Sequence, residues 1–252
     1  MRQYVYLFLL LTLVVSCNST NKNATDTLQF EQKEFVQSSD NCMDDECTRI
    51  RLSVPVITNE SHEIAAKINQ QLIAQIDRIV AVDEVTASSA TLEELTAHYI
   101  ANYNAFKTKY PDETLPWKAE VEGDITFYND DLLSIALEYY TFAGGAYGFK
   151  SEMALNFNPK TGEPYKTEDL IDNWEELQKL MALQLKDKMD IWTDNNQLKY
   201  PESIFFYEDT VGFLYNAVDD DAQYNGPTKI DFPKASILPF LKIDLAPKTT
   251  EK

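Results

Sequence analysis

The chain has 252 residues, of which 44% are hydrophobic and 25% charged, an ordinary composition for a globular protein. Its 22 Lys and Arg residues are outnumbered by 41 Asp and Glu residues, which gives a net charge of −19. Such a surface repels nucleic acid and anionic lipid headgroups, so the sequence predicts no nucleic-acid partner and favours basic partners.

The first 16 residues form a predicted export signal. Arg2 precedes an apolar run that is too short and too close to the N-terminus for a lasting transmembrane helix. The run ends in Ser16 and Cys17, a small residue followed by a cysteine, which resembles the bacterial lipobox. We therefore expect removal of residues 1–16 and lipidation of Cys17, including palmitate; an ordinary signal peptide is the alternative.

Lipidation would tie the mature chain to the bacterial cell envelope through the lipid alone. Asn18 is not the aspartate associated with inner-membrane retention, so the sequence favours the outer membrane, facing the periplasm. Residues 17–27 are small and polar and form a predicted tether. Since processing removes only Arg2 among the charged residues, the mature chain has 21 basic and 41 acidic residues, a net charge of −20.

Two cysteines remain beyond Cys17. Cys42 and Cys47 are separated by the four residues MDDE, and an exported protein folds in an oxidising compartment. A disulfide between them is expected, with free thiols as the alternative. His62 and His98 are the only histidines and lie far from this pair in sequence, so no metal site is predicted.

The first part of the folded region predicts strands and then helices. Residues 48–57 alternate between apolar and polar side chains, which is typical of a half-buried strand, and residues 28–36 are expected to form its partner strand. From residue 61 the apolar period changes to that of a helix. Thr91 and Glu94 form a capping box at the start of a second helix, which Pro111 ends.

Alternation returns in the second half of the chain. Strands are expected over residues 117–129, 132–142, 150–157, 203–208, 211–217 and 228–232. A capping box of Asp172 and Glu175 predicts a helix start, and a last helical turn lies near residues 236–241.

Helices come in blocks beside hairpins, without a regular β-α-β rhythm. The predicted fold class is therefore α+β, with a mainly antiparallel sheet and helices packed on one face. Two intimately joined subdomains are predicted, over residues 28–129 and 130–252.

Three of the seven glycines lie in the stretch TFAGGAYGF, residues 141–149. The stretch has no G-x-G-x-x-G spacing and no following Lys-Ser or Lys-Thr, and a strand pattern comes after it. It therefore predicts no nucleotide cofactor, and no other cofactor is expected. We interpret it as a bend between two strands, in which Gly144 and Gly145 let the chain turn.

No catalytic residue is assigned from the sequence. No G-x-S-x-G motif occurs, and two histidines leave few Ser-His-Asp arrangements. Paired carboxylates keep a carboxylate-dependent glycan hydrolase as an alternative. The candidate acids are Asp130, Asp131, Glu138, Asp219, Asp220 and Asp221.

Three segments resemble a known bacterial domain in order and spacing: LEYYTFAGGAYG, LNFNPKTGEPYKTEDLI and VGFLYNAVDDDAQYNGPTKIDFPKASI. They are similar to an extracytoplasmic domain of the lysozyme-sensing anti-sigma factor RsiV and of the non-catalytic N-terminal part of PdaC-type peptidoglycan deacetylases. The segment CTRIRLSVPVI and the helix after it resemble the companion N-terminal subdomain of these proteins. The resemblance covers about residues 28–245.

This resemblance implies an α+β ectodomain that binds a partner at the cell envelope. In the anti-sigma factor the partner is lysozyme, a basic protein, which the charge of −20 would suit. The sequence shows neither a cytoplasmic anti-sigma segment nor a deacetylase domain, so neither whole-protein function is expected. Tyr147 stands where the family commonly has histidine, and Val218 with the acidic Asp219, Asp220 and Asp221 stands where the family has YEIA.

We therefore expect a non-catalytic, lipid-anchored binding module for a peptidoglycan-like glycan or an envelope protein, with a lysozyme-binding inhibitor or sensor as an alternative. The candidate binding residues are aromatic side chains beside the glycines and acidic side chains in the last motif. They are Tyr140, Phe142, Tyr147, Phe149, Asp219, Asp220 and Asp221.

Overall fold

The computed structural model describes residues 27–40, 47–59, 63–82, 89–112, 115–185, 198–215 and 227–246. The predicted signal peptide, Cys17 and nearly all of the tether lie outside these residues, as do Cys42 and the acidic triplet Asp219, Asp220 and Asp221. Lipidation and the disulfide therefore stay predictions.

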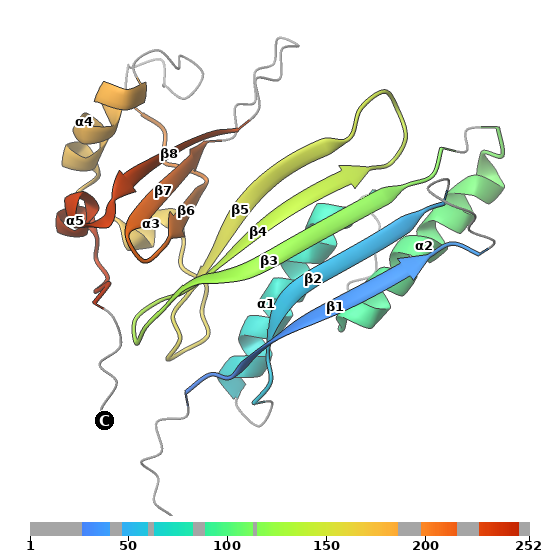
Figure 1. Ribbon diagram of the computed structural model, residues 1–252, viewed down its shortest axis with the longest axis horizontal. Helices are drawn as coiled ribbons and strands as arrows, with labels where there is room; N and C mark the ends of the chain where they lie inside the picture. The colour runs from blue at the N-terminus through green and yellow to red at the C-terminus, as the bar shows by residue number, and fades with distance from the viewer. Residues whose placement is uncertain are drawn as a thin grey trace, which may run out of the picture.

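A five-stranded sheet forms the larger part of the fold (Figure 1). Its strands lie side by side in chain order: β1 (Phe30–Ser38), β2 (Arg49–Ile57), β3 (Lys118–Tyr128), β4 (Leu133–Phe142) and β5 (Phe149–Phe157). Neighbours are antiparallel except β2 and β3, which run parallel. A parallel pair needs a long crossover, which the helices α1 (Glu63–Val80) and α2 (Leu92–Lys109) supply.

Both crossover helices cover the same face of the sheet, which we call the helix face (Figure 1). Ile50, Leu52 and Val54 of β2 are fully buried there, whereas Arg49 and Arg51 lie on the opposite, open face. Burial of alternate apolar side chains fixes the register of a strand against its neighbours. The predicted apolar stripe of the first helix is confirmed at Ile68, Leu72, Ile76 and Val80, which are buried, whereas Ile64 is partly buried.

The start of α2 confirms Thr91 as the predicted N-cap, but Glu94 accepts from the residue before Thr91 and not from Thr91 itself. The Oγ1 atom of Thr91 accepts a hydrogen bond from the backbone N–H of Glu94 at 3.1 Å. In return, the Glu94 carboxylate accepts one from the N–H of Ala90 at 2.9 Å. These bonds satisfy backbone donors that the first helical turn leaves unpaired.

The start of α4 (Trp174–Leu185) differs from the prediction by one residue. Asn173, not Asp172, caps this helix, because its Oδ1 accepts the N–H of Glu176 at 3.2 Å. The N–H of Asp172 instead donates to the carbonyl of Phe240 at 2.8 Å. Asp and Asn are about equally good caps, so this tertiary bond decides between them.

A second, three-stranded antiparallel sheet is built from β6 (Ser203–Phe206), β7 (Thr210–Tyr215) and β8 (Thr228–Pro233). Three short helical segments complete this part: α3 (Thr167–Leu170), α5 (Lys234–Ile237) and η3 (Leu238–Phe240). With α4 they enclose a core of its own, centred on Phe206 and Phe213. The predicted subdomain boundary at residue 129 falls between β3 and β4, which are neighbours in the first sheet.

The second sheet lies against one end of the open face of the first, with β6 closest to β3, β4 and β5. Ala136 and Ala154 sit opposite each other on β4 and β5 at this end. Their small side chains leave room for the second sheet. The Nδ2 atom of Asn156 donates to the carbonyl of Ile204 at 2.8 Å across the junction.

These layers confirm the predicted α+β class with a mainly antiparallel sheet and helices on one face. Within the described ranges, no helix combines the length and the hydropathy that a membrane crossing requires.

Candidate functional site

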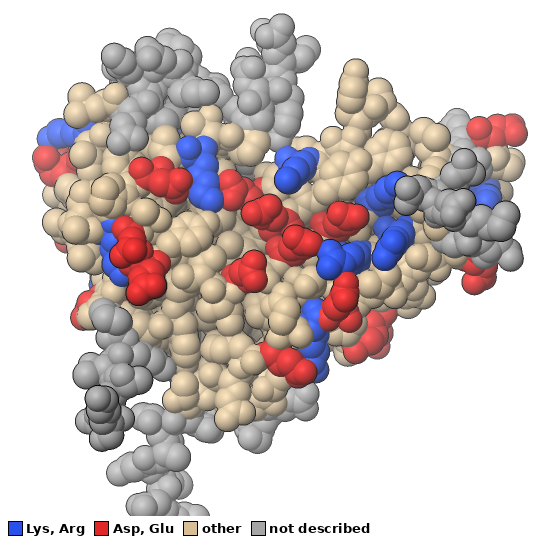
Figure 2. Space-filling view, in the orientation of Figure 1, with Lys and Arg blue, Asp and Glu red and all other residues tan. Residues whose placement is uncertain are grey.

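Acidic side chains gather over the middle of the open face (Figure 2). Strand register aligns three of them directly opposite one another: Glu122 on β3, Glu138 on β4 and Glu152 on β5. We call these three residues the acidic ladder. Glu120 and Asp124 flank it on β3, because they share the face of Glu122 by alternation.

Each end of the acidic ladder is paired with a cation. Arg51 of β2 contacts Glu122 at 2.7 Å and Glu34 of β1 at 2.7 Å. At the other end, the Lys229 ammonium of β8 contacts the Glu152 carboxylate at 2.8 Å. Within the described part of the chain, the central carboxylate of Glu138 has no ion pair or hydrogen bond.

These contacts shift the pKa values of both cations. Hydrogen bonds to Glu34 and Glu122 raise the pKa of Arg51, so its charge is fixed. Burial lowers the pKa of Lys229, but hydrogen bonds to Glu152 and Tyr207 outweigh burial and raise it overall. The Lys229 ammonium also lies 3.9 Å from the ring centroid of Phe205, a cation–π contact.

The acidic ladder is unfavourable for the fold itself. Like charges that lie directly opposite on neighbouring strands destabilise a sheet. Glu122 and Glu138 are exposed, so water screens their repulsion and keeps the cost small. A cation brought by a partner would remove this repulsion, and the arrangement is therefore suited to a basic partner.

The glycine-rich stretch connects β4 to β5, which confirms its interpretation as a bend between two strands. Gly144 and Gly145 have φ angles of 95° and 89°, in the left-handed region that favours glycine. Gly148 differs from these two, since a Cβ atom there would lie 2.3 Å from the Tyr140 hydroxyl and would displace the end of that side chain. Gly148 thus lets the hairpin backbone lie directly on the Tyr140 ring.

The structure divides the four predicted aromatic residues among three places. Tyr140 and Phe142 lie on the open face, in register with Glu120 and Lys118. Phe149 lies opposite Thr141 on the helix-face side, with its ring centroid 6.1 Å from that of Tyr139. Tyr147 stands at the hairpin and is 91% exposed. They do not form one platform.

Two of the acids considered for hydrolysis, Asp131 and Glu138, lie far apart, and Asp219, Asp220 and Asp221 lie outside the described residues. Asp131 precedes β4 and pairs with Lys160 at 2.6 Å. Glu138 lies seven residues further along the same segment, roughly 20 Å away at strand spacing. Asp131 and Glu138 are therefore too far apart to act as one catalytic pair.

The hairpin also borders a cavity of about 530 Å³ on its other side. Gly144 and Gly145 form one wall, and Phe106 and Trp117 lie across from them. The indole Nε1 of Trp117 is buried and has no hydrogen-bond partner among the residues that the structure describes. Among the described residues, no three His, Cys, Asp or Glu side chains gather as metal ligands.

A family model matches the middle of the chain. Residues 42–150 match the family model of the deacetylase PdaC. This range of the chain includes β2, both crossover helices and the hairpin tip. These residues form a PdaC-like domain. The resemblance stated from the sequence is confirmed over this range, and it indicates an extracytoplasmic, envelope-associated module.

Two solved structures share the fold of this chain. A DUF3298 family member from Bacteroides fragilis NCTC 9343 has a TM-score of 0.61 at 19% identity, over 86% of this chain and 94% of that one. A DUF3298 family protein from Pseudomonas aeruginosa PAO1 has a TM-score of 0.59 at 15% identity, over 88% of this chain and 98% of that one. No curated protein matches the sequence.

The sequence alone missed most of the open-face site. Glu138 was a candidate acid, but Glu122, Glu152 and their partners Arg51 and Lys229 were not. Alternation in residues 117–129 already puts the β3 acids on one face. The missing information is the register between strands, which brings together residues from β3, β4, β5 and β8.

Proposed function

We propose that this chain is a non-catalytic binding module of the cell envelope that binds a basic envelope protein on its open face. The observation that carries the proposal is the acidic ladder, whose central Glu138 has no cation partner among the described residues. The net charge of −20 in the mature chain would steer a basic partner toward this face. A lysozyme is the natural probe, because it is a basic protein.

Attachment to the outer membrane through lipidated Cys17 is part of the same proposal. A lipid anchor would hold the module in the periplasm and leave the open face free to meet a partner. Mass spectrometry of the native protein tests this directly: a diacylated or triacylated N-terminal Cys17 is expected, and an unmodified mature N-terminus at another residue contradicts it.

The binding test uses the full chain in detergent and hen lysozyme at low and high salt. Replacing the acidic ladder by Glu122→Gln, Glu138→Gln and Glu152→Gln should weaken binding about tenfold, since each exposed pair contributes well under 1 kcal/mol. High salt should remove most of this difference.

The matched control removes three exposed acids elsewhere: Glu63→Gln, Asp112→Asn and Glu175→Gln. It changes the net charge equally but leaves the open face intact. Equal loss of binding in both triple variants would show that net charge alone attracts the partner, and no binding by the unchanged chain would remove a lysozyme-like partner altogether.

A second candidate ligand is a peptidoglycan-like glycan at the hairpin. The observation that favours it is Tyr147, whose ring is 91% exposed at the tip of a loop. Exposed aromatic rings offer an apolar face to ligands. Retention on insoluble peptidoglycan should fall in Tyr147→Ala and persist in the ladder variant; retention that is unchanged in Tyr147→Ala contradicts it.

A further inference from the structure

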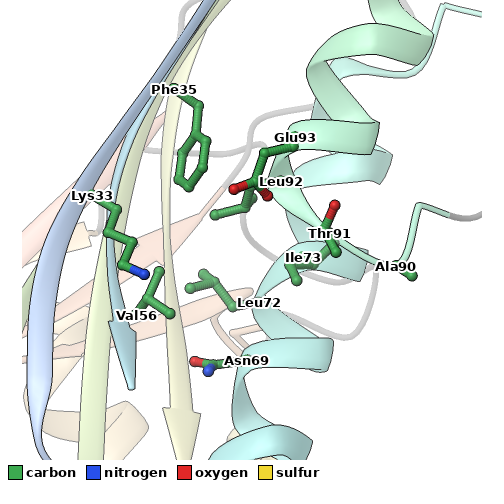
Figure 3. A pocket seen from close by; sticks show the side chains of 10 residues that line it. All are labelled: Lys33, Phe35, Val56, Asn69, Leu72, Ile73, Ala90, Thr91, Leu92 and Glu93. Carbon is green, nitrogen blue, oxygen red and sulfur yellow. The ribbon is translucent and has the colours of Figure 1, made fainter. Parts of the chain in front are cut away.

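A cavity of about 230 Å³ opens between the edge strand β1 and the two crossover helices, on the opposite side of the sheet from the acidic ladder (Figure 3). Its inner walls are apolar, formed by Leu72 and Ile73 of α1 and by Leu92 of α2. Phe35 of β1 closes the sheet side. Drug-sized ligand pockets measure roughly 300–1,000 Å³, so this one suits a smaller molecule.

Two opposite charges point into this cavity from facing walls (Figure 3). Lys33 comes from β1, and Glu93 comes from the first turn of α2. Lys33 is held only loosely, since its ammonium lies 4.0 Å from the Glu31 carboxylate, at the limit of an ion pair. The Glu93 side chain has no hydrogen bond or ion pair to any residue that the structure describes.

The other polar side chains in the cavity wall already make hydrogen bonds within the protein. Asn69 accepts from the N–H of Ile57 at 3.0 Å and donates to its carbonyl at 2.9 Å. The Thr91 hydroxyl caps α2 through the N–H of Glu94. Lys33 and Glu93 are therefore the groups that remain to recognise a ligand, one for a negative charge and one for a positive charge.

From this arrangement we propose that the cavity binds a free α-amino acid with an aliphatic side chain. The ligand carboxylate pairs with Lys33, its ammonium pairs with Glu93, and its side chain packs against Leu72, Ile73 and Leu92. The side chains of Lys33 and Glu93 are long and flexible, so they can reach the carboxylate and the ammonium that are attached to the same Cα atom of the ligand. The site is independent of the acidic ladder and of its basic partner.

An inward-pointing lysine on an edge strand can also prevent that strand from pairing with the edge of another sheet. That role involves no ligand and does not require Glu93. It predicts that loss of Lys33 leads to self-association, whereas the binding site predicts a change in affinity that depends on the charge of the ligand.

The test is a calorimetric or NMR titration of the full chain with L-leucine, L-leucinamide and N-acetyl-L-leucine. Leucinamide retains only the ammonium, and N-acetyl-leucine retains only the carboxylate. Glu93→Gln should weaken leucine and leucinamide about tenfold and leave N-acetyl-leucine unchanged, because a neutral amide pairs with the ligand ammonium less strongly than a carboxylate does. Lys33→Met should weaken leucine and N-acetyl-leucine and leave leucinamide unchanged.

Controls separate this site from general charge effects. Lys150→Met and Glu175→Gln remove the same charges from exposed positions outside the cavity and should change no affinity. Glycine, which has no side chain, should bind far more weakly than leucine.

Three results would overturn the proposal. They are no leucine binding at about 10 mM, where even a weak site of millimolar dissociation constant is largely filled; equal binding of glycine and leucine; and equal effects of both charge variants on all three leucine derivatives. Self-association of Lys33→Met with unchanged leucine affinity would assign Lys33 to edge protection instead.

Discussion

The same strands form both faces of the five-stranded sheet, but one face is buried against helices and the other carries exposed charges. On the helix face, Leu52, Val121 and Leu137 are fully buried and pack against α1 and α2. On the open face, Glu122 and Glu138 repel each other across neighbouring strands and are exposed to water. The helix face therefore supplies the stability that allows the open face to carry an unfavourable arrangement of charge.

The largest effect is expected from the helix face. Leu137 is fully buried on β4, next in the chain to Glu138. Leu137→Ala should lower the free energy of unfolding by about 2–5 kcal/mol, because it removes buried methyl groups and leaves a cavity. Urea unfolding followed by circular dichroism measures this loss. A loss below about 1 kcal/mol would mean that the helix face can collapse around the gap.

Alkaline pH should lower the stability of the protein through a buried tyrosine on the helix-face side. Burial raises the pKa of Tyr99 in α2, so between about pH 10 and that raised value the unfolded chain is ionised there and the folded one is not. Stability should therefore fall as pH rises above 10, by up to about 1.4 kcal/mol per pH unit for this group.

Tyr99→Phe should make this alkaline slope shallower, and urea unfolding at pH 9, 10 and 11 measures it. Burial raises the pKa of Tyr215 in the second core in the same way, so Tyr215→Phe should have a similar effect. Tyr147→Phe changes an exposed side chain and serves as the control. An unchanged slope in both buried variants would contradict the prediction.

A smaller effect is expected at the hairpin, where the two faces end. Gly144→Ala forces a side chain into a backbone with φ of 95°, which costs about 1–2 kcal/mol, although no atom lies near the new Cβ. Gly148→Ala instead displaces the Tyr140 ring, a flexible side chain. Urea unfolding should thus show a clear loss for Gly144→Ala, and lysozyme binding should stay unchanged in that variant.

The smallest effect, and of opposite sign, is expected on the open face. Glu138→Gln removes the central charge of the acidic ladder, so the protein should become more stable by a few tenths of a kcal/mol. Thermal unfolding at low salt shows the gain, which should vanish at high salt. A destabilised Glu138→Gln variant would show that the carboxylate has a partner that stabilises the fold.

Much of the fold follows from local sequence patterns. Alternation predicts the strands and both faces of β2, and the pair Thr91 and Glu94 predicts the start of α2. The start of α4 was misplaced because Asp172 and Asn173 are both good caps, and the choice depends on a bond to Phe240, which is far away in sequence.

The candidate sites depend on information that local patterns lack. The acidic ladder requires the register of three strands, and the Lys229 contact requires the docking of a second sheet. The cavity beside Lys33 requires the spacing between β1 and two helices. Aromatic residues near the glycines looked like a cluster in sequence, but alternation and the turn send Tyr140, Tyr147 and Phe149 in different directions.

The parallel pairing of β2 with β3 in the five-stranded sheet has a kinetic consequence. The β1–β2 unit and the β3–β4–β5 unit each form through short connections, but joining them closes a long loop that contains α1 and α2. Loop closure costs chain entropy before non-local contacts stabilise the product, so this joining should be the slow step of folding. The helix face and the open face, so unlike at equilibrium, would then appear in the same event.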